Sequence, residues 1–432
     1  MTWQIIGMLA VITAIGVSIA LHEIGHLVPA KKFGVRVSDY AVGFGPSIWS
    51  KRVGETLYAI RMIPLGGYIR MIGMYPPARK PVGSGRFAQL AESARQEALS
   101  EILESDQGRT FYELPVHKRI VIMLGGPSMN LVLAVLFFGA ALVGIGVTTP
   151  TLTVREVTPC YVSEQNPRGA QVNGVCEEGV SAAAQAGLQP GDIVTKVNGV
   201  AVADWADLGV KLEEFGQGGA GSVTFVRDGM TMTRNVDYQS LTLNRYDENG
   251  EPTGETYSRA FLGVVSIWER ESLPLTSVPS VMWNMTVLSA EAILNFPQKI
   301  VDLAQTLIND GERDPNGPVS VVGATRIGGE IAASEWTNTD KAFSLMMLVG
   351  SLNLFLFLFN LLPFLPLDGG HVAGAVWEIG RDGVNRLRGR PKGGPVDIAR
   401  LLPFTYAVSV VLIAVGVLVI WADIVKPISI GG

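Results

Sequence analysis

Leu21-His22-Glu23-Ile24-Gly25-His26 is the stretch that decides the fold, and it closes an apolar run that begins at Trp3. On a helix, His22 and His26 are four residues apart, so they share a face and both reach one Zn²⁺. Glu23 lies beside them, where a hydrolytic site needs a general base. The alternative is a pair of helix-interior histidines with ordinary hydrogen-bond partners. We favour the metal site, because the chain has only four histidines and ionisable groups in apolar spans are usually functional.

The rest of the chain is also rich in apolar residues. Hydrophobic residues make up 48% of the 432, and the mean hydropathy of +0.31 is high for a soluble protein. Several apolar runs are long enough to cross about 30 Å of hydrocarbon. We therefore expect a polytopic α-helical membrane protein, embedded in a lipid bilayer, with four transmembrane helices at residues 1–30, 120–148, 342–371 and 403–425.

Basic residues indicate the orientation of these helices. Residues 31–119 hold 14 of the 34 Lys and Arg residues, and the loop at 372–402 holds six more. Both segments should therefore face the cytoplasm. The segment from 150 to 341 holds 13 basic and 25 acidic residues, which places it on the opposite side. The formal net charge of −5 argues against a nucleic-acid partner.

Short strands are predicted directly after the zinc motif. Thr56–Ile63 is a strand-like run, and the glycines and proline of Val42-Gly43-Phe44-Gly45-Pro46 and Pro64-Leu65-Gly66-Gly67 indicate turns around it. We expect a membrane-associated β-hairpin region here, within the cytoplasmic-side segment 31–119, followed by an amphipathic helix at 86–104. An edge strand would hold a substrate peptide in extended form. The alternative is a flap that only shields the metal from lipid.

The external segment contains a recognisable pattern at 181–199. A short helix ending at Gly187 leads into a Pro-Gly turn, a strand and an Asn-Gly turn, which resembles the core of a bacterial PDZ domain. We expect one extracytoplasmic PDZ-like α+β domain at 150–240, and an amphipathic connector at 260–340. The PDZ-like domain would bind an extended peptide or a substrate terminus, or else only filter substrates by size.

Two cysteines, Cys160 and Cys176, fall in this external segment. An oxidising compartment allows them to form a disulfide, and the alternative is two separate buried thiols. No histidine lies in the segment, so metal binding by this pair is disfavoured.

A catalytic zinc site needs a third protein ligand. Asp368 is the first acidic residue after Asp340, and two prolines break the third apolar run just before it. We expect Asp368 to turn inward as the third ligand, with an interfacial helix cap as its alternative role and His371 as a competing ligand. Asn130, in the second run, is a candidate for supporting the site or for an interhelical hydrogen bond.

These motifs together resemble the site-2 protease family, and most of all its bacterial RseP-type members. The resemblance rests on His22-Glu23-Ile24-Gly25-His26, Gly43-Phe44-Gly45-Pro46, Pro64-Leu65-Gly66-Gly67-Tyr68, Gly126-Pro127-Ser128-Met129-Asn130 and the run from Asn360 to His371. It implies zinc ligation by His22, His26 and Asp368, with Glu23 as the catalytic base. It also implies substrate contacts from Asn360 and, in the hairpin region, from Gly43, Gly45, Gly66 and Gly67. Unlike members with two tandem PDZ domains, this chain shows one PDZ-like core.

The resemblance implies a multi-pass protein of the bacterial plasma membrane that performs regulated intramembrane proteolysis. Its substrates would be single-span membrane proteins, such as an anti-sigma factor, cut within their transmembrane segment after a first-site cut. Two other functions use the same residues: a membrane zinc transporter or metal sensor, and a catalytically silent PDZ scaffold. The near absence of acids and histidines in the other spans disfavours transport, and the intact His-Glu-x-x-His motif disfavours the scaffold.

Overall fold

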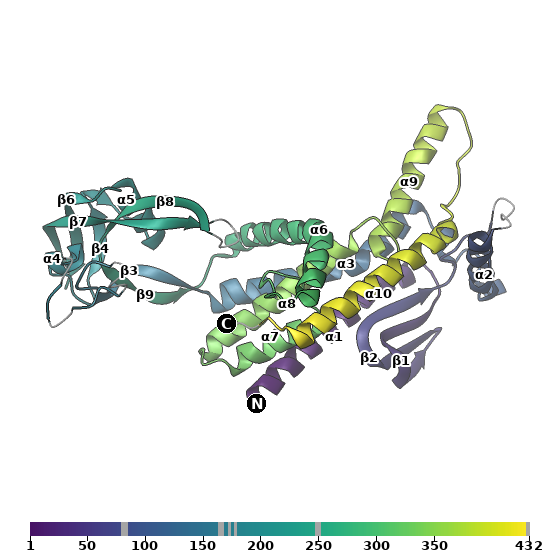
Figure 1. The fold of residues 1–432 in the computed structure, drawn as a ribbon. Helices are drawn as coiled ribbons and strands as arrows, with labels where there is room; N and C mark the ends of the chain where they lie inside the picture. Colours follow the sequence, from purple (N-terminus) through teal and green to yellow (C-terminus); the bar gives the residue numbers. More distant parts are fainter. Residues whose placement is uncertain (79–84, 163–167, 172–173, 177–178, 247–251, 429–432) are drawn as a thin grey trace. The chain divides into compact units, whose positions relative to one another are not determined.

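The computed structural model describes all residues except 79–84, 163–167, 172–173, 177–178, 247–251 and 429–432. The chain divides into two compact units. The helical unit comprises Met1–Ile145 and Leu273–Gly432, and the sheet unit comprises Gly146–Ser272. Figure 1 shows the ribbon of both units.

Among the described residues, four helices of the helical unit are long and apolar enough to cross a membrane. The protein is therefore an integral membrane protein, as the sequence predicted. A π-helical turn, Ala140–Ile145, extends the second helix, and the third ends at Asn360, earlier than expected. The four helices are α1 (Thr2–Lys32), α3 (Val116–Gly139), α8 (Asn338–Asn360) and α10 (Leu402–Val425).

Glycines allow α1 to pack closely against two neighbours. Gly25 of α1 and Gly125 of α3 face each other so closely that a Cβ on either would clash with the backbone carbonyl of the other. Gly7, near the start of α1, packs in the same way on Gly328 of α7 (Val321–Ala333). Because the two contacts lie at opposite ends of α1, they fix both ends of the helix that carries the zinc motif.

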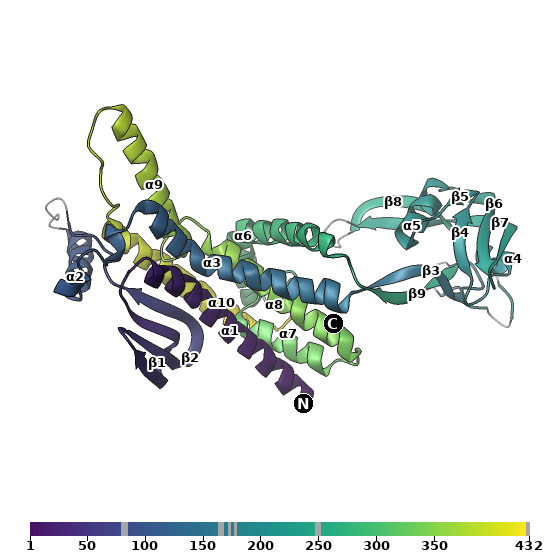
Figure 2. The ribbon, with the colours of Figure 1, turned by 180° about the vertical axis from the view of Figure 1, so that it is seen from behind.

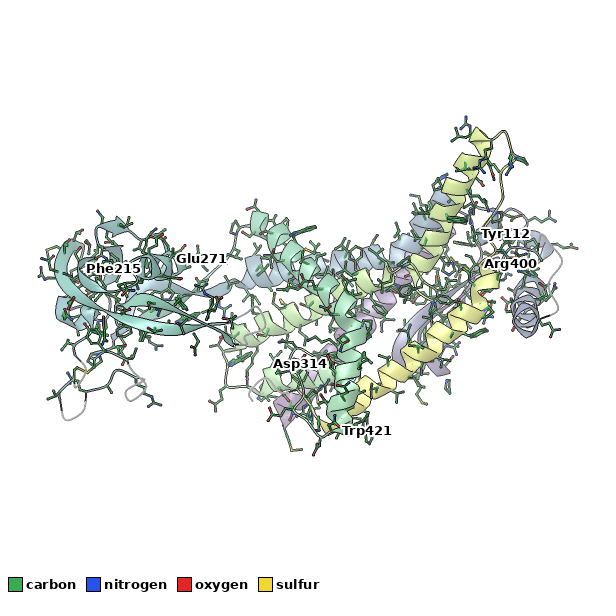
Figure 3. The ribbon with its side chains drawn as sticks, turned by 45° about the horizontal axis from the view of Figure 1, so that its top comes forward. Tyr112, Phe215, Glu271, Asp314, Arg400 and Trp421 are labelled. Carbon is green, nitrogen blue, oxygen red and sulfur yellow. A yellow bond between two sulfur atoms is a disulfide. The ribbon has the colours of Figure 1, made fainter. Side chains whose placement is uncertain are left out.

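The connector before α8 contains two helices, α6 (Val278–Ile308) and α7. A buried network joins the start of α7 to the end of α10. Asp423 accepts hydrogen bonds from the backbone N–H and the hydroxyl of Ser320, and it forms a 2.6 Å ion pair with Arg313. Figure 3 shows Asp314 and Trp421 at this end of the helical unit, with Tyr112 and Arg400 at the other.

Two long strands, β1 (Val37–Val53) and β2 (Thr56–Met71), lie beside α1 (Figure 2). Residues 39–42 of β1 pair on one side with residues 57–60 of β2 and on the other side with residues 67–70. Each strand therefore bends and is used twice, which gives four short antiparallel segments with residues 67–71 at one edge.

The expected turn at residues 42–46 is part of β1 in the structure. Gly43 and Gly45 have φ angles of +89° and +85°, a region that favours glycine. These conformations bend the strand sharply, while residues on both sides of the bend remain paired with β2. The glycines therefore mark a bend within the strand.

A helix also replaces part of the loop expected at 372–402. Helix α9 runs from Asp368 to Leu387, and Arg119 of α3 holds it through a buried 2.7 Å ion pair with Glu378. The pairing partner lies 259 residues away, so no local pattern predicts it. The amphipathic helix predicted at 86–104 is present as α2 (Arg86–Ser100), and short 3-10 turns occur at Glu104–Asp106, Phe111–Glu113, Leu275–Ser277 and Ile398–Leu401.

The described residues of the sheet unit form a seven-stranded sheet around one hydrophobic core. The unit continues to Ser272, beyond the boundary expected at 240, because β7 extends to Tyr246 and two further strands follow, the last of which ends at Glu271. The strand order is β8-β7-β6-β4-β3-β9, with β5 beside β4. The elements are β3 (Val147–Val157), α4 (Ala182–Ala186), β4 (Ile193–Val197), β5 (Val200–Ala201), α5 (Trp205–Glu214), β6 (Gly219–Arg227), β7 (Met230–Tyr246), β8 (Pro252–Phe261) and β9 (Val264–Glu271).

Local features of the sheet unit follow the sequence closely. Gly187 ends α4 in a left-handed conformation, and Cys160 is joined to Cys176 by a disulfide, as the sequence allowed. Burial by itself would raise the pKa of Asp192, but hydrogen bonds from Arg227 and from the N–H of Gln189 outweigh it and hold the pKa below its ordinary value. This ionised pair fixes the turn before β4.

Candidate metal centre

Three side chains from two helices converge on one point in the helical unit. His22 and His26 come from α1, and Asp368 is the first residue of α9. The two Nε2 atoms are 3.2 Å apart, and each lies 3.3 Å from Oδ2 of Asp368. The three ligand atoms therefore form a nearly equilateral triangle, and this is the group within the described residues that could hold a metal ion.

The size of the triangle fits zinc. Tetrahedral Zn²⁺ with ligand distances of about 2.0–2.1 Å requires ligand atoms about 3.3 Å apart. The observed edges of 3.2, 3.3 and 3.3 Å match one face of such a tetrahedron. Two imidazoles and one carboxylate are also a ligand set found in hydrolytic zinc enzymes, which keep the fourth position for water or substrate.

Both histidine rings are oriented through their second nitrogen. Nδ1 of His26 donates a 2.7 Å hydrogen bond to the backbone carbonyl of Ile122, which leaves Nε2 free for a metal. The side-chain amide of Asn130 lies 3.1 Å from Nδ1 of His22. Metal on Nε2 leaves the proton of His22 on Nδ1, so the amide must present its oxygen there. The structure places Nδ2 at this position and leaves the buried Oδ1 of Asn130 without a hydrogen-bond partner among the described residues, so exchanging the two amide atoms would pair Oδ1 with the Nδ1 proton.

Gly126 of α3 forms the floor of this centre. A Cβ built on Gly126 would clash with Nε2 of His26 and lie 2.7 Å from Nε2 of His22. Such an atom would occupy the space between the ligand nitrogens, which is where a metal would bind. The absence of a side chain at 126 therefore creates the room for the ion.

The sheet of β1 and β2 contacts the metal centre where Gly67 packs against Glu23. Glu23 is 8% exposed, and a Cβ on Gly67 would come within 2.9 Å of its Cγ. Gly67 lies in residues 67–71 of β2, whose partners within the described sheet are on one side, in β1. The backbone of this edge segment therefore passes directly beside the Glu23 side chain.

The remaining predicted residues lie at different distances from the centre. Asn360 is the last residue of α8, and the bend at 361–367 connects it to Asp368. Gly43, Gly45 and Gly66 shape the bends of the sheet, whereas Gly67 is the glycine of this set that packs on Glu23. His371 lies one turn beyond Asp368 and does not belong to the ligand triangle.

Sequence reasoning missed two contributions to the centre. One is the floor at Gly126, although the adjacent pair Gly125-Gly126 was a visible signal for close helix packing. The other is the buried hydrogen bond from Asn353 of α8 to Ser18 of α1, which is 3.0 Å long. Ser18 precedes His22 by one turn, so this bond ties α8 to α1 directly beside the ligands.

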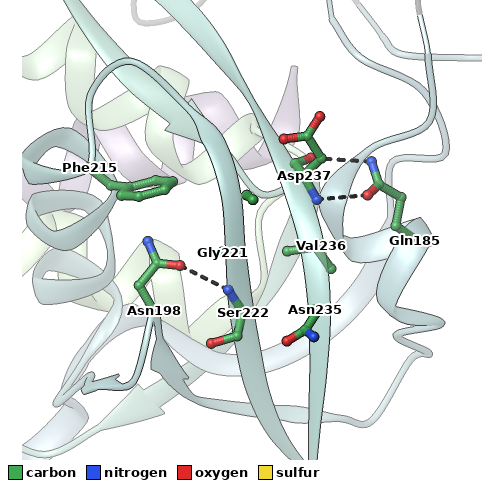
Figure 4. Close-up of a pocket in the computed structure, with 9 residues that line it drawn as sticks. Gln185, Asn198, Phe215, Gly221, Ser222, Asn235, Val236 and Asp237 are labelled. Atoms are coloured by element: carbon green, nitrogen blue, oxygen red, sulfur yellow. Dashed lines mark hydrogen bonds between the residues drawn. The ribbon is translucent and has the colours of Figure 1, made fainter.

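The sheet unit contains a separate surface pocket, shown in Figure 4. Its polar side chains already hold the backbone: the Gln185 amide accepts from the N–H of Asp237, and Asn198 accepts from the N–H of Ser222. These groups are occupied in joining neighbouring elements, and the pocket lacks histidine.

Comparison with known proteins identifies the family. Residues 10–390 match the profile of peptidase family M50. The chain belongs to this family of site-2 proteases. Its curated relatives include zinc metalloprotease Rip1 of Mycobacterium tuberculosis H37Rv, 33% identical over 433 residues with 96% of both chains covered. Rip1 of Mycolicibacterium smegmatis is 33% identical, covering 98% of both chains, and a putative zinc metalloprotease of Vibrio cholerae is 29% identical over 73% of this chain.

The chain is thus a zinc metalloendopeptidase in a membrane, and the group formed by His22, His26 and Asp368 is the candidate for its metal centre. Bound Zn²⁺ supplies a Lewis acid that activates water and polarises the scissile carbonyl. The ligand triangle, the oriented rings and the floor at Gly126 all fit that ion.

Asp368→Asn should lower the zinc content of the purified protein several-fold, because an amide binds Zn²⁺ more weakly than a carboxylate. Zinc per chain, measured by plasma mass spectrometry, checks this. Asp382→Asn, on the same helix but hydrogen-bonded to Arg381 and Gly393, is the matched control and should keep its zinc. Unchanged stoichiometry in Asp368→Asn would show that another residue is the ligand.

Proposed function

We propose that this protein cleaves the transmembrane segments of single-span membrane proteins, with an anti-sigma factor as the model substrate, after a first cut elsewhere. The observation that carries this proposal is the position of the site. The ligands lie on apolar helix α1 and at the bend after apolar helix α8, and an unshared strand edge lies beside them. A hydrolytic site so placed acts on peptide bonds at the level of the bilayer.

Each residue then has a role in the proposed mechanism. His22, His26 and Asp368 hold Zn²⁺. Glu23 takes the proton from the attacking water and passes it to the leaving amine. Asn360, at the end of α8, binds the substrate next to the scissile bond, and its amide stabilises the developing oxyanion. Asn130 and the carbonyl of Ile122 keep the two imidazoles in the required tautomer.

The strand edge provides a place where an unwound segment of a helical substrate can bind. A peptide bond within a helix is shielded by its own hydrogen bonds, so the segment must unwind before cleavage. Residues 67–71 offer backbone groups to replace the lost bonds by strand addition. Because Gly67 packs on Glu23, a strand added here runs past the base.

We further propose that the sheet unit is a PDZ-like domain that binds an extended peptide. A groove lies between α5 and the segment Arg259–Val264, with Leu208, Leu212 and Leu262 in its lining. Strand β9, at the end of the sheet order, begins at Val264 beside this groove. The edge strand can pair with the backbone of a peptide terminus, and the apolar groove can hold its last side chain.

Titration of the full-length protein with fluorescent peptides ending in an apolar residue tests this groove. A peptide with a free carboxyl terminus should bind, and its amidated counterpart should bind several-fold more weakly. Binding of neither peptide would leave the unit as a steric filter.

The orientation follows from charge. We place the motif end of α1, the loop at 31–119 and the loop after α9 on the cytoplasmic side of a bacterial plasma membrane, and the sheet unit outside. The Cys160–Cys176 disulfide supports the external placement, since disulfides persist in oxidising compartments.

One reconstitution experiment separates the proposed protease from its alternatives. The purified protein is placed in vesicles with a labelled single-span peptide, with and without a zinc chelator. Site-2 proteolysis predicts products cut within the apolar segment, lost on chelation and restored by zinc. A transporter would instead move zinc across the vesicle without cutting, and a silent scaffold would bind the peptide and leave it intact in both conditions.

A further inference from the structure

Helix α9 has its polar face turned inward and its apolar face turned outward. Glu378 is 5% exposed and pairs with Arg119, and its second oxygen accepts from the N–H of Val396. The large apolar residues of the helix are mostly exposed: Val376 56%, Trp377 69%, Ile379 53%, Val384 45% and Leu387 89%. A surface helix in water shows the opposite arrangement.

The exposed residues form one continuous stripe. Val376, Gly380 and Leu387 follow one another at helical spacing, and Trp377 and Val384 lie beside them on the same face. Glu378, Arg381 and Asn385 occupy the opposite face. Both views of the ribbon show much of α9 projecting away from the other helices of its unit, which agrees with the exposure of the stripe (Figures 1 and 2).

The position of α9 indicates what covers this stripe. The helix begins eight residues after the membrane span α8 ends at Asn360, so it starts at the membrane boundary. Trp377 is a residue type enriched at that boundary. Exposed basic residues continue from the last turn of the helix into the following segment, namely Arg386, Arg388, Arg390 and Lys392. The apolar stripe and the basic end together are typical of an amphipathic helix that lies in the interface of a membrane with anionic lipids.

We propose that the apolar face of α9 inserts into the membrane leaflet at which α8 ends, and that the basic residues from Arg386 to Lys392 bind the phosphate groups of anionic lipids. The helix carries the zinc ligand Asp368 at its start and is fixed to α3 through Glu378. The lipid surface therefore sets the direction of the element that positions Asp368.

Spin labels on single cysteines test this proposal in the full-length protein. The described cysteines are both in the disulfide, so an introduced thiol is the one that reacts. Val384→Cys and Leu387→Cys place labels on the stripe, and Glu97→Cys, at an exposed position of α2 outside the basic segment, provides an aqueous control. The labelled proteins are reconstituted in vesicles of phosphatidylcholine with phosphatidylglycerol, and accessibility to oxygen and to a water-soluble nickel chelate is measured.

Labels at 384 and 387 should show an oxygen-to-nickel accessibility ratio several-fold above that of the label at 97. Nickel accessibility equal to that at 97 would overturn the proposal, because the stripe would lie in water. Strong spin–spin broadening at 384 and 387 would also overturn it, since a second copy of the chain would then cover the stripe.

The charge component is tested by lipid composition. In vesicles of phosphatidylcholine alone, the label at 387 should move toward water, with a several-fold lower oxygen-to-nickel ratio. A variant with Arg386, Arg388, Arg390 and Lys392 all changed to Gln should show the same ratio in both vesicle types, with zinc content confirming its fold. Equal ratios for the unmodified basic segment in both vesicle types would refute phosphate binding.

Discussion

Glu23→Gln should abolish cleavage of a membrane-spanning peptide and leave zinc bound. Glu23 is buried beside the ligand triangle, to which it does not belong, and it packs on the edge strand at Gly67. The proposed mechanism therefore has it exchange protons with water and substrate. Glutamine keeps the shape of the glutamate side chain but cannot act as a base. General-base catalysis contributes on the order of 10²–10⁴-fold to the reaction rate. Turnover of a labelled single-span peptide and zinc per chain are the two measurements.

A surface variant on the same unit controls for nonspecific effects. Glu97→Gln changes an exposed carboxylate of α2 and should keep both turnover and zinc. Substantial turnover by purified Glu23→Gln would remove Glu23 from the mechanism. Loss of zinc from this variant would instead make Glu23 a ligand, which the triangle geometry argues against.

Gly126→Ala should empty the metal centre. The added Cβ would fall between the two imidazole nitrogens, at the place that the ion requires, and both the backbone of α3 and the histidines of α1 are fixed by close packing. We expect loss of nearly all bound zinc and of all peptidase activity, measured by plasma mass spectrometry and peptide turnover.

Gly139→Ala is the matched control, because Gly139 lies on the same helix and a Cβ there meets no atom within 4 Å. It should retain zinc and activity. Wild-type zinc content in Gly126→Ala would show that the ion binds away from the space between the two Nε2 atoms, which would contradict the proposed ligand set.

Much of the site could be predicted from the sequence, because its residues are either close together in the sequence or of types that are rare in the apolar runs. His22 and His26 are four residues apart on one helix, so helical geometry alone brings them together. Asp368 was identifiable because acidic residues are absent from the apolar run before it and two prolines break that run. The structure places all three within one ligand triangle.

The features that escaped prediction depend on partners distant in sequence. The double use of β1 and β2 requires bends at Gly43 and Gly45, and glycine alone does not distinguish a bend from a turn. The partner of Glu378 is 259 residues away, so α9 looked like part of a charged loop. The sheet unit extended past 240 for the same reason, since β9 pairs with β3, more than a hundred residues earlier.

The ion pair between Arg119 and Glu378 has a mechanical consequence. Glu378 lies ten residues after Asp368 on one helix, which corresponds to about 15 Å along the axis. A helix attached at two such points keeps its direction, whereas a helix attached at one point can rotate about that point. The second attachment is the close packing of Gly369 and Gly370 on the backbone of residues 361–365, so α9 keeps its direction and holds Asp368 facing the two histidines.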